Sequence, residues 1–546
     1  MTFSSSPLHP DVVCRGDVLK ALSSSEPFDM VVVGGGIHGA AAARLAAGLG
    51  FRVALLEKAD YAAATSSRSS KMAHGGLRYL ELFDFEQVFE GIKAREEMFE
   101  RIGHLVKPAD FLIPVPKHAW WFRTKLSIGL SLYDLLVKRG ARRHRWIPRR
   151  KLNYPGFHAD RANLMGCFLY TDGIMSDARV VFENILGARR YGAYCLNYCE
   201  VTSVQRDEND LMTLFVRDCK GAREFSVRAK VVLNCAGPWA SSVAQSLGAE
   251  GHSLKFSRGS HIIFNTKWTG PSLFLPMPGK ARYYFVWPHP AGTLVGTTER
   301  EVSGLELDPV PSGDEIEEIL SRLQKDIPDA GLTRENAVYC FAGIRTLPTR
   351  GKSSSSSVLS RKHVWTQSHG IINLFGGKYT TASWTALEGV KAAAKYLGRE
   401  ITNRGLKTRP DLKELPGSMR GAEESLVRER LAYEGISTGD QERLVGRYGR
   451  RLMQQGICSG TSGNVERIVE EEVSLALQVE QAESLEDVLR RRLELEYTED
   501  HGERYMRIIR EVFSRLRPDI DFDKELSMYR ERMKRVSHIL GKPALR

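Results

Sequence analysis

The chain has 546 residues, 42% of them hydrophobic and 26% charged, which is the composition of a soluble globular protein. This length is too great for a single hydrophobic core, so two or three domains are expected. No stretch approaches the ~18 consecutive apolar residues of a membrane-spanning helix, so no span is predicted. The net charge of +12, from 78 basic and 66 acidic residues, suits nucleic acid, anionic lipid or an anionic substrate.

The cysteines and the first residues indicate the chemical environment. The eight cysteines are scattered without C-x-x-C spacing, and the closest two are Cys195 and Cys199, so reduced thiols in a cytosolic setting are expected. Residues 1–27 have neither the apolar core of a secretory signal nor an Arg-rich amphipathic face. We predict a flexible lead-in there, and no metal site, because the sequence holds no cluster of metal ligands.

The strongest local pattern begins at Asp29. Met30–Val33 is apolar, rich in valine and too short for a core helix, which predicts a buried parallel strand. Glycines follow it at the spacing G-x-G-x-x-G, where the first permits a tight turn, the second lets the backbone approach a pyrophosphate and the third lets a helix pack closely. The glycines predicted to bind a dinucleotide are Gly34, Gly35, Gly36 and Gly39.

The residues after these glycines complete the pattern. Ala40–Leu49 has the composition of a helix, whose N-terminus would direct amide groups at the pyrophosphate. A second strand, Arg52–Leu56, ends in Glu57, a carboxylate at the strand tip that suits a ribose hydroxyl. Because an acid rather than an arginine occupies this tip, we expect FAD or NAD rather than a ligand with a 2′-phosphate.

Tyr61–Leu80 is a small, polar segment directly after this unit. It could be a serine-rich surface loop, but its position favours a second interpretation, in which small residues let the backbone lie against a flavin. The candidate cofactor contacts are Thr65, Ser66, Ser70, Gly75 and Gly76, and the side chains that can face a substrate are His74, Arg78 and Tyr79.

The middle of the chain predicts a second sheet. Phe285–Trp287 and Thr293–Thr298 are typical of a hairpin, and with Ser260–Asn265 they suggest a mostly antiparallel sheet. Before them, Lys230–Cys235 predicts a strand that is broken sharply, so that main chain can approach a ligand. The breaking residues are Ala236, Gly237 and Pro238.

A later segment predicts a return to the first domain. Ile371–Phe375 is a strand pattern, Gly376 and Gly377 form a turn, and Thr380–Tyr396 has a helical pattern whose N-terminus is available to a flavin. This order implies two interleaved domains with the active site between them.

These motifs together resemble those of the FAD-dependent glycerol-3-phosphate dehydrogenases and the related glycerophosphate oxidases. The resemblance runs from about residue 28 to about residue 516, with one departure at Thr346, where the family usually has proline. The matching segments are GGGIHGA, ATSSRSSKMAHGGLRYLE, VVLNCAGPWA (Val231–Ala240), GSHII (Gly259–Ile263), GTTER (Gly296–Arg300), AGIRTL (Ala342–Leu347) and LFGGKYTT (Leu374–Thr381).

The resemblance implies an α/β fold in which an FAD-binding Rossmann-like domain is interleaved with an antiparallel β-rich substrate domain and followed by an all-helical C-terminal domain. It implies FAD as the cofactor and sn-glycerol 3-phosphate as the substrate. The expected parts are a nucleotide unit at 28–80, a basic segment at 117–151, a β-rich substrate part at about 255–345, a return to the FAD domain at 346–400 (together the interleaved domains 28–409) and a helical domain at 410–546.

Oxidation of a secondary alcohol phosphate needs a hydride acceptor, a base and cations that hold a phosphate dianion, and the cofactor carries the hardest step. Arg78, Arg345 and Lys378 supply positive charge in motifs that adjoin the flavin, and Arg345 can also stabilise a developing alkoxide. Tyr79 could hydrogen-bond the phosphate or only pack. The further residues expected to contact the flavin are Ala236, Gly237, Gly376, Gly377 and Lys378.

Two histidines are candidates for the base, since imidazole titrates near neutrality. His74 is the first choice because of its position in the motif. His261 is the second choice, and otherwise contacts the substrate. Each could instead be a structural histidine with satisfied hydrogen bonds.

Lys117–Lys151 carries eleven Lys or Arg and one acid, together with several aromatic residues. Within Ala119–Lys138 an apolar stripe recurs at helical spacing and basic residues lie mostly off it, which favours an interfacial helix on an anionic membrane surface. A surface helix with a solvated basic face is the alternative, and nucleic acid is not expected because no binding module is present. The stripe is Phe122, Leu126, Leu130, Tyr133 and Val137.

From about Pro410 the composition predicts helices. A stripe from Val465 to Val479 indicates one helix, and Ser484–Asp487 is typical of a capping box before a helix over Val488–Tyr497. A role of this domain in oligomer contacts, for instance in a homodimer, is left open.

The resulting prediction is a membrane-associated FAD-dependent glycerol-3-phosphate dehydrogenase that yields dihydroxyacetone phosphate and passes electrons to quinone. The family resemblance implies a peripheral membrane protein, and the lack of a transit-peptide pattern favours the cytoplasmic face of a bacterial inner membrane. The alternatives are a glycerophosphate oxidase that uses oxygen, an amino-acid oxidase, and a catalytically inactive FAD-binding scaffold. The oxidases often carry an insertion ahead of the helical domain, and the short segment Arg399–Pro416 leaves little room for one here.

Overall fold

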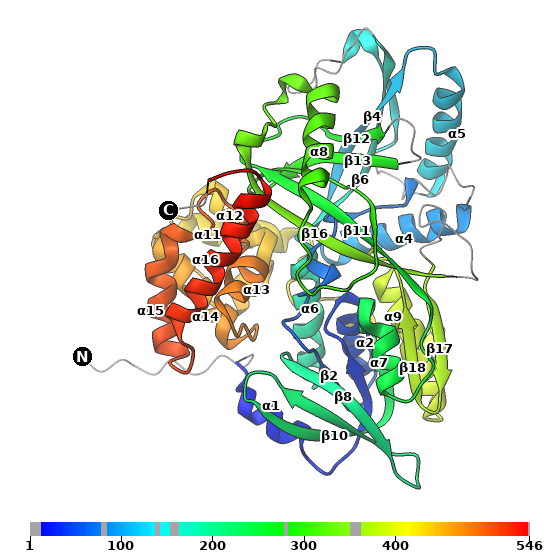
Figure 1. The fold of residues 1–546 in the computed structure, drawn as a ribbon, viewed down its shortest axis with the longest axis vertical. Helices are drawn as coiled ribbons and strands as arrows, with labels where there is room; N and C mark the ends of the chain where they lie inside the picture. The colour runs from blue at the N-terminus through cyan, green and yellow to red at the C-terminus, as the bar shows by residue number, and fades with distance from the viewer. Residues whose placement is uncertain are drawn as a thin grey trace.

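A computed structural model describes residues 12–77, 84–136, 142–152, 163–277, 282–349 and 362–543. It has two sheets and a group of helices (Figure 1). The sheet around the first glycine motif lies at the bottom of the view, the second sheet lies above it, and the C-terminal helices cover one side. The predicted α/β class with an all-helical C-terminal region is confirmed.

The first sheet, here called the parallel sheet, is organised around β1 (Phe28–Val33). β1 pairs in parallel with β2 (Val53–Leu56) and with β10 (Arg223–Asn234), so the carboxyl ends of these three strands meet at one edge. Its valines are buried because helices cover both faces of the sheet. The remaining strands are β7 (Tyr194–Leu196), β8 (Cys199–Arg206), β9 (Met212–Asp218), β17 (Val364–Ser368) and β18 (Ile371–Phe375), with helices α2 (Ile37–Gly48), α6 (Asp177–Arg190), α7 (Ala240–Ser246) and α9 (Ala382–Tyr396).

The second sheet, here called the antiparallel sheet, contains the predicted hairpin and strands that were not predicted. β13 (Arg282–His289) and β14 (Gly292–Gly296) pair in antiparallel fashion, as predicted. The sheet also takes β4 (Val106–Pro116) and β6 (Leu164–Met175) from the first third of the chain, which the local patterns did not reveal. Its other strands are β3 (Met72–Ala73), β5 (Arg145–Pro148), β11 (Leu254–Phe264), β12 (Ser272–Met277), β15 (Arg300–Val302) and β16 (Ala337–Pro348), with helix α8 (Gly313–Asp326) beside them.

The expectation of a flexible lead-in is corrected for part of residues 1–27. Helix α1 (Arg15–Leu22) buries Leu19 and Leu22 against the parallel sheet. Arg15 holds it there, because its guanidinium donates to Asp218 at 2.7 Å. Residues 1–11 lie outside the described residues.

The predicted basic helix is α5 (Trp120–Leu136), beside α4 (Phe85–Arg101). Leu130 and Tyr133 of the predicted stripe are buried. Phe122 and Leu126 pack against the same core as Leu130, Tyr133 packs with Val88 and Ile92 of α4, and Val137 lies outside the described residues. The stripe therefore faces the protein. The outer face also carries apolar residues, which the pattern did not predict, and α5 and α4 together expose Trp120, Trp121, Ile128, Leu132, Leu135, Phe85 and Phe89.

The C-terminal region is helical, but one predicted helix is wrong. In place of a helix over Val488–Tyr497 the chain forms a π-helical turn, Asp487–Arg492, and a 3-10 turn, Leu495–Tyr497. Three consecutive buried arginines explain the departure, because each pairs with carboxylates that a regular solvent-facing helix would not reach. The helices are α11 (Ala422–Tyr433), α12 (Thr438–Tyr448), α13 (Arg451–Gln454), α14 (Val465–Gln478), α15 (Met506–Leu516) and α16 (Phe522–Ile539), preceded by α10 (Asn403–Lys407).

Buried ion pairs join these helices to the parallel sheet. Asp60, just after β2, accepts from Arg491 at 2.6 Å and from Arg492 at 2.8 Å. Arg179 of α6 donates to both oxygens of Glu480 at 2.7 and 2.8 Å. Removing one partner of such a pair leaves an uncompensated buried charge, so the helical region is an integral part of the fold. No helix in the described ranges is long and apolar enough to cross a bilayer.

Candidate active site

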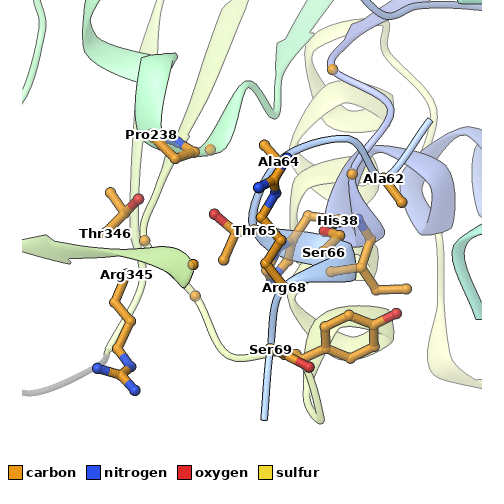
Figure 2. Close-up of a pocket in the computed structure, with 18 of the residues that line it drawn as sticks. His38, Ala62, Ala64, Thr65, Ser66, Arg68, Ser69, Pro238, Arg345 and Thr346 are labelled. Carbon is orange, nitrogen blue, oxygen red and sulfur yellow. Dashed lines mark hydrogen bonds between the residues drawn. The ribbon is translucent and has the colours of Figure 1, made fainter. Parts of the chain in front are cut away.

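A cavity of about 650 Å³ lies between the two sheets, in the size range of cofactor and small-molecule sites. One end is lined by Lys58, Trp239 and Ser246 beside the parallel sheet, and the other by His261 and Arg345 of the antiparallel sheet. Figure 2 shows Pro238, Thr346 and Arg345 on one side of this space, and His38, Ser66 and Arg68 on the other.

Two of the four predicted glycines open into the cavity. Gly34 and Gly36 line it, and Gly34 has a φ of +109°, a conformation that favours glycine. A Cβ at Gly36 would meet only Ser66 Oγ, at a tight 3.1 Å, and the residue lines the cavity. Gly39 serves packing, since a Cβ there would lie 1.9 Å from the Gly34 carbonyl oxygen. Gly35 does not line the cavity, and its amide donates to Glu57 at 2.6 Å.

Glu57 lies at the cavity wall at the tip of β2, as predicted. Its two carboxylate oxygens accept from the amides of Gly35, at 2.6 Å, and Ala59, at 2.8 Å. These bonds fix the side chain but leave further lone pairs for a hydroxyl donor. Burial raises the pKa of Glu57, and the two amides oppose that shift.

The serine-rich segment lines the cavity through Thr65, Ser66 and Ser70. Ser66 Oγ accepts from the Ile37 amide at the start of α2, and Thr65 Oγ1 donates to the Ile344 carbonyl of β16. The segment thus bridges the two sheets. Gly343 of β16 lines the cavity and also makes room for the segment, because a Cβ there would lie 2.3 Å from the Arg68 carbonyl oxygen.

The next predicted residues along the chain are His74, Gly75 and Gly76. His74 and Gly76 line the cavity. Gly75 does not, which corrects its assignment as a cofactor contact, since a Cβ there would lie 2.3 Å from the Tyr133 hydroxyl. Arg78 and Tyr79 lie outside the described residues.

Arg345 reaches the cavity from β16, where it lies opposite Ser257 of β11. Its guanidinium donates to Thr297 Oγ1 at 2.8 Å and to the Thr298 carbonyl at 3.4 Å. Gly259 makes this path available, because a Cβ there would lie 2.4 Å from Arg345 Nη2. The guanidinium is therefore held in place by the antiparallel sheet before any ligand binds.

His261 lines the cavity beside Arg345 and is 2% exposed. Its ring stacks on Phe341 at 4.8 Å, and Nε2 lies 3.0 Å from Ser70 Oγ. Among the described residues Nδ1 is buried without a hydrogen-bond partner. Burial, then the charges of Arg345 and Lys71, lower the pKa of His261 to about 3, so the ring is neutral at physiological pH.

Two further predicted turns complete the wall of the cavity. Ala236 and Gly237 follow β10, and Gly376, Gly377 and Lys378 follow β18. All five line the cavity. Because β10 and β18 are parallel neighbours, both turns lie at the same edge of the sheet as the glycine motif.

Comparison with known proteins decides the family. Residues 29–384 match the family described as FAD dependent oxidoreductase. The chain is 30% identical to a glycerol-3-phosphate dehydrogenase of Synechocystis, with 87% of this chain and 90% of that protein covered. The chain belongs to the FAD-dependent glycerol-3-phosphate dehydrogenase family. It is also 34% identical to D-erythritol 1-phosphate dehydrogenase of Brucella abortus, with 68% of this chain and 74% of that protein covered.

A solved structure shares the fold of this FAD-dependent oxidoreductase. The glycerol-3-phosphate dehydrogenase of Bacillus halodurans, complexed with FAD, superposes with a TM-score of 0.76 at 20% identity. The superposition covers 97% of this chain and 98% of that one. The predicted family resemblance and the predicted cofactor, FAD, are confirmed.

The cavity of this family member fits FAD on its own geometry. The N-terminus of α2, with Gly34 and Gly36, is suited to a diphosphate. Nε2 of His38 is buried at the wall without a partner among the described residues, beside Gly377. Burial lowers the pKa of His38 to about 4, so it offers a neutral ring rather than a charge. Supplied with FAD, these residues would hold the diphosphate and flank the flavin.

Several lining residues of this dehydrogenase family member were missed by the sequence patterns. Arg68 is buried, donates to the Ala63 carbonyl at 3.1 Å and pairs with Asp308. Lys58 lies 3.7 Å from the centre of the Trp239 ring. Arg68 lies between the predicted Ser66 and Ser70, and Lys58 directly follows Glu57. Their partners, Asp308 and Trp239, are far away in sequence, so no local pattern could identify them. Asp172 of β6 also lines the cavity.

Proposed function

We propose that the chain oxidises sn-glycerol 3-phosphate to dihydroxyacetone phosphate. One observation carries this proposal: the cations Arg345 and Lys378 and the histidines His74 and His261 line the same cavity as the FAD-binding glycine motif. The names of the relatives support the substrate. A phosphate dianion needs fixed cations, and the alcohol needs a proton acceptor within reach.

Each residue has a separate role in this proposal. Bound FAD supplies the hydride acceptor for the hydrogen on C2. Arg345, held by Thr297, binds the substrate and steadies the oxygen of C2 as negative charge develops. His74 takes the hydroxyl proton. His261, whose low pKa makes it a poor proton acceptor, offers its neutral ring as a hydrogen-bonding group. Lys378, together with Arg78 and Tyr79, holds the phosphate.

D-erythritol 1-phosphate is a second candidate substrate, because the relative from Brucella abortus is named for it. Both compounds are polyol phosphates, so the same cations would serve either one. The two candidates differ in chain length and in hydroxyl groups, and a comparison of rates with both distinguishes them.

We propose quinone as the electron acceptor and an anionic bilayer as the surface on which the protein works. Exposed apolar residues gather on α5 and α4, and Trp121 and Leu135 are 79% and 80% exposed. Arg142, Arg143 and Arg145 follow α5 on the exposed surface. Apolar residues flanked by arginines are typical of interfacial binding, and a bacterial inner membrane would supply such a surface.

The position of α5 supports the quinone proposal. Tyr133, on the inner face of α5, contacts Tyr170 of β6 with ring centres 6.2 Å apart. Tyr170 in turn lines the cavity. The face proposed to touch the membrane is therefore separated from the cofactor cavity by few side chains, which favours an acceptor dissolved in the bilayer.

Turnover with glycerol 3-phosphate under a water-soluble quinone analogue, compared with turnover under oxygen, tests this function. We expect fast reduction of the quinone and little hydrogen peroxide. Fast peroxide formation would instead identify a glycerophosphate oxidase. No turnover of glycerol 3-phosphate or of D-erythritol 1-phosphate with either acceptor would favour a non-catalytic FAD-binding scaffold.

Replacing Trp121, Ile128 and Leu135 by serine should weaken binding to anionic vesicles, because it removes the apolar part of the attraction. Replacing Arg142, Arg143 and Arg145 by serine should weaken binding at low salt and have less effect at high salt, because the screening length falls from ~30 Å at 0.01 M to ~3 Å at 1 M salt. Sedimentation with vesicles measures both effects.

The matched control replaces Leu426 and Tyr433 of α11, which are 60% and 83% exposed, by serine. In Figure 1, α11 and α5 lie on opposite sides of the molecule. This control should bind vesicles like the unmodified protein. Equal binding by all the variants would contradict the membrane proposal.

A further inference from the structure

Behind His74 lies a buried cluster to which the proposed reaction assigns no role. It consists of Arg95 of α4, Tyr133 of α5 and Asp172 of β6, each at most 2% exposed. Arg95 Nη1 donates to Asp172 Oδ1 at 3.0 Å and also contacts the Tyr133 hydroxyl. The Tyr133 hydroxyl donates to the same carboxylate oxygen at 3.3 Å.

The cluster holds the main chain next to His74. Asp172 Oδ1 also accepts from the Gly75 amide at 3.0 Å. A carboxylate that is paired with a guanidinium is a strong acceptor for a backbone amide, so this bond fixes the peptide between His74 and Gly75. On the other side of His74, Ala73 pairs with Gly173 in the antiparallel sheet.

Close packing fixes Gly75 as firmly as the hydrogen bond does. A Cβ on Gly75 would lie 2.3 Å from the Tyr133 hydroxyl and 2.8 Å from Ile92 Cγ1. A Cβ on Gly91 of α4 would lie 2.8 Å from the Gly75 carbonyl oxygen. The main chain at Gly75 is therefore enclosed by α4, α5 and β6, which leaves His74 between two immobilised neighbours and facing the cavity.

We infer that Arg95, Tyr133 and Asp172 are positioning residues for His74. Tyr133 thereby makes α5 part of the scaffold of the active site. This inference rests on the proposed function for the role of His74 as the base. A base works only when its ring nitrogen is held within hydrogen-bond reach of the proton, and misplacement by about 1 Å costs roughly a hundredfold in rate.

Tyr133→Phe is the most informative variant. It removes one hydroxyl and keeps the Arg95–Asp172 pair, whereas replacing either charged residue would leave an uncompensated buried charge and compromise folding. The matched control is Tyr284→Phe, because Tyr284 is also buried, donates to Asp326 at 2.7 Å and does not line the cavity.

The first measurement needs no substrate. We expect faster hydrogen exchange in peptides that cover residues 72–77 in the FAD-bound Tyr133→Phe protein, and unchanged exchange of these peptides in the Tyr284→Phe protein. Unchanged exchange in Tyr133→Phe would overturn the inference, whether or not the proposed substrate is the correct one.

The second measurement asks whether the cluster acts through His74. Tyr133→Phe should lower the rate of anaerobic flavin reduction at saturating glycerol 3-phosphate about tenfold to a hundredfold, with little change in FAD content or KM. In a His74→Gln background the same substitution should have no further effect, because residues that act as one unit are not additive. Equal losses in both backgrounds would overturn the inference. If the unmodified protein does not reduce its flavin, the proposed function fails, and the exchange measurement still decides whether the cluster holds this segment.

Discussion

Arg345→Lys is expected to keep the fold and the FAD and to lose the reaction. The rate of flavin reduction at saturating substrate should fall about a hundredfold to a thousandfold, equivalent to ~3–4 kcal/mol of transition-state stabilisation. The guanidinium is held by Thr297 Oγ1 and the Thr298 carbonyl and offers paired donors in one plane. A lysine ammonium group is a point charge on a flexible stem and cannot reproduce both contacts. Anaerobic stopped-flow absorbance of the flavin measures this step directly.

The control for this prediction is Arg258→Lys on the neighbouring strand β11. Arg258 pairs with Glu315 at 2.7 Å and does not line the cavity, so the same substitution there should leave the reduction rate near that of the unmodified protein. If Arg345→Lys reduces its flavin at nearly the unmodified rate, Arg345 contributes binding at most, and the role of stabilising the alkoxide passes to Arg78 or Lys378.

Gly36→Val is expected to give a folded protein without FAD. Gly36 precedes α2 with φ −77° and ψ −178°, an extended conformation that valine adopts readily. Its Cβ would meet only Ser66 Oγ in the protein, at 3.1 Å, so the Ser66 side chain must shift by a few tenths of an ångström. The branched side chain would then project into the cavity where the diphosphate must approach the backbone. The ratio of flavin absorbance to protein absorbance measures the loss, and circular dichroism checks the fold.

Gly313→Val is the matched control for this substitution. Gly313 lies at the start of α8, and a Cβ there would meet nothing within 4 Å. This variant should retain full flavin content. Normal flavin content in a folded Gly36→Val protein would mean that the glycine motif does not bind the cofactor.

The nucleotide-binding unit could be predicted because its information is local. Asp29–Glu57 contains a short valine-rich strand, three spaced glycines, an alanine-rich helix and an acid at the next strand tip. The structure places the glycines and the acid at one edge of the parallel sheet. The motifs around Arg345 and Lys378 could be predicted because they match segments of the family that the sequence resembles. Each contributes cavity-lining residues directly after or within a strand.

The remaining parts of the site depend on contacts between distant segments. β4 and β6 join the antiparallel sheet through pairing with each other and with strands far along the chain, which local patterns do not specify. Gly75 was predicted as a cofactor contact, but Tyr133, fifty-eight residues later, occupies the space beside it. Arg68 likewise depends on Asp308, which is 240 positions away.

Anaerobic addition of glycerol 3-phosphate to the purified yellow protein tests the central claim most directly. The proposed function predicts that the visible flavin absorbance bleaches, that dihydroxyacetone phosphate forms in amounts equal to the reduced flavin, and that a quinone analogue restores the colour. D-Erythritol 1-phosphate, added in parallel, identifies the preferred polyol phosphate. A flavin that remains oxidised with both compounds would contradict the account.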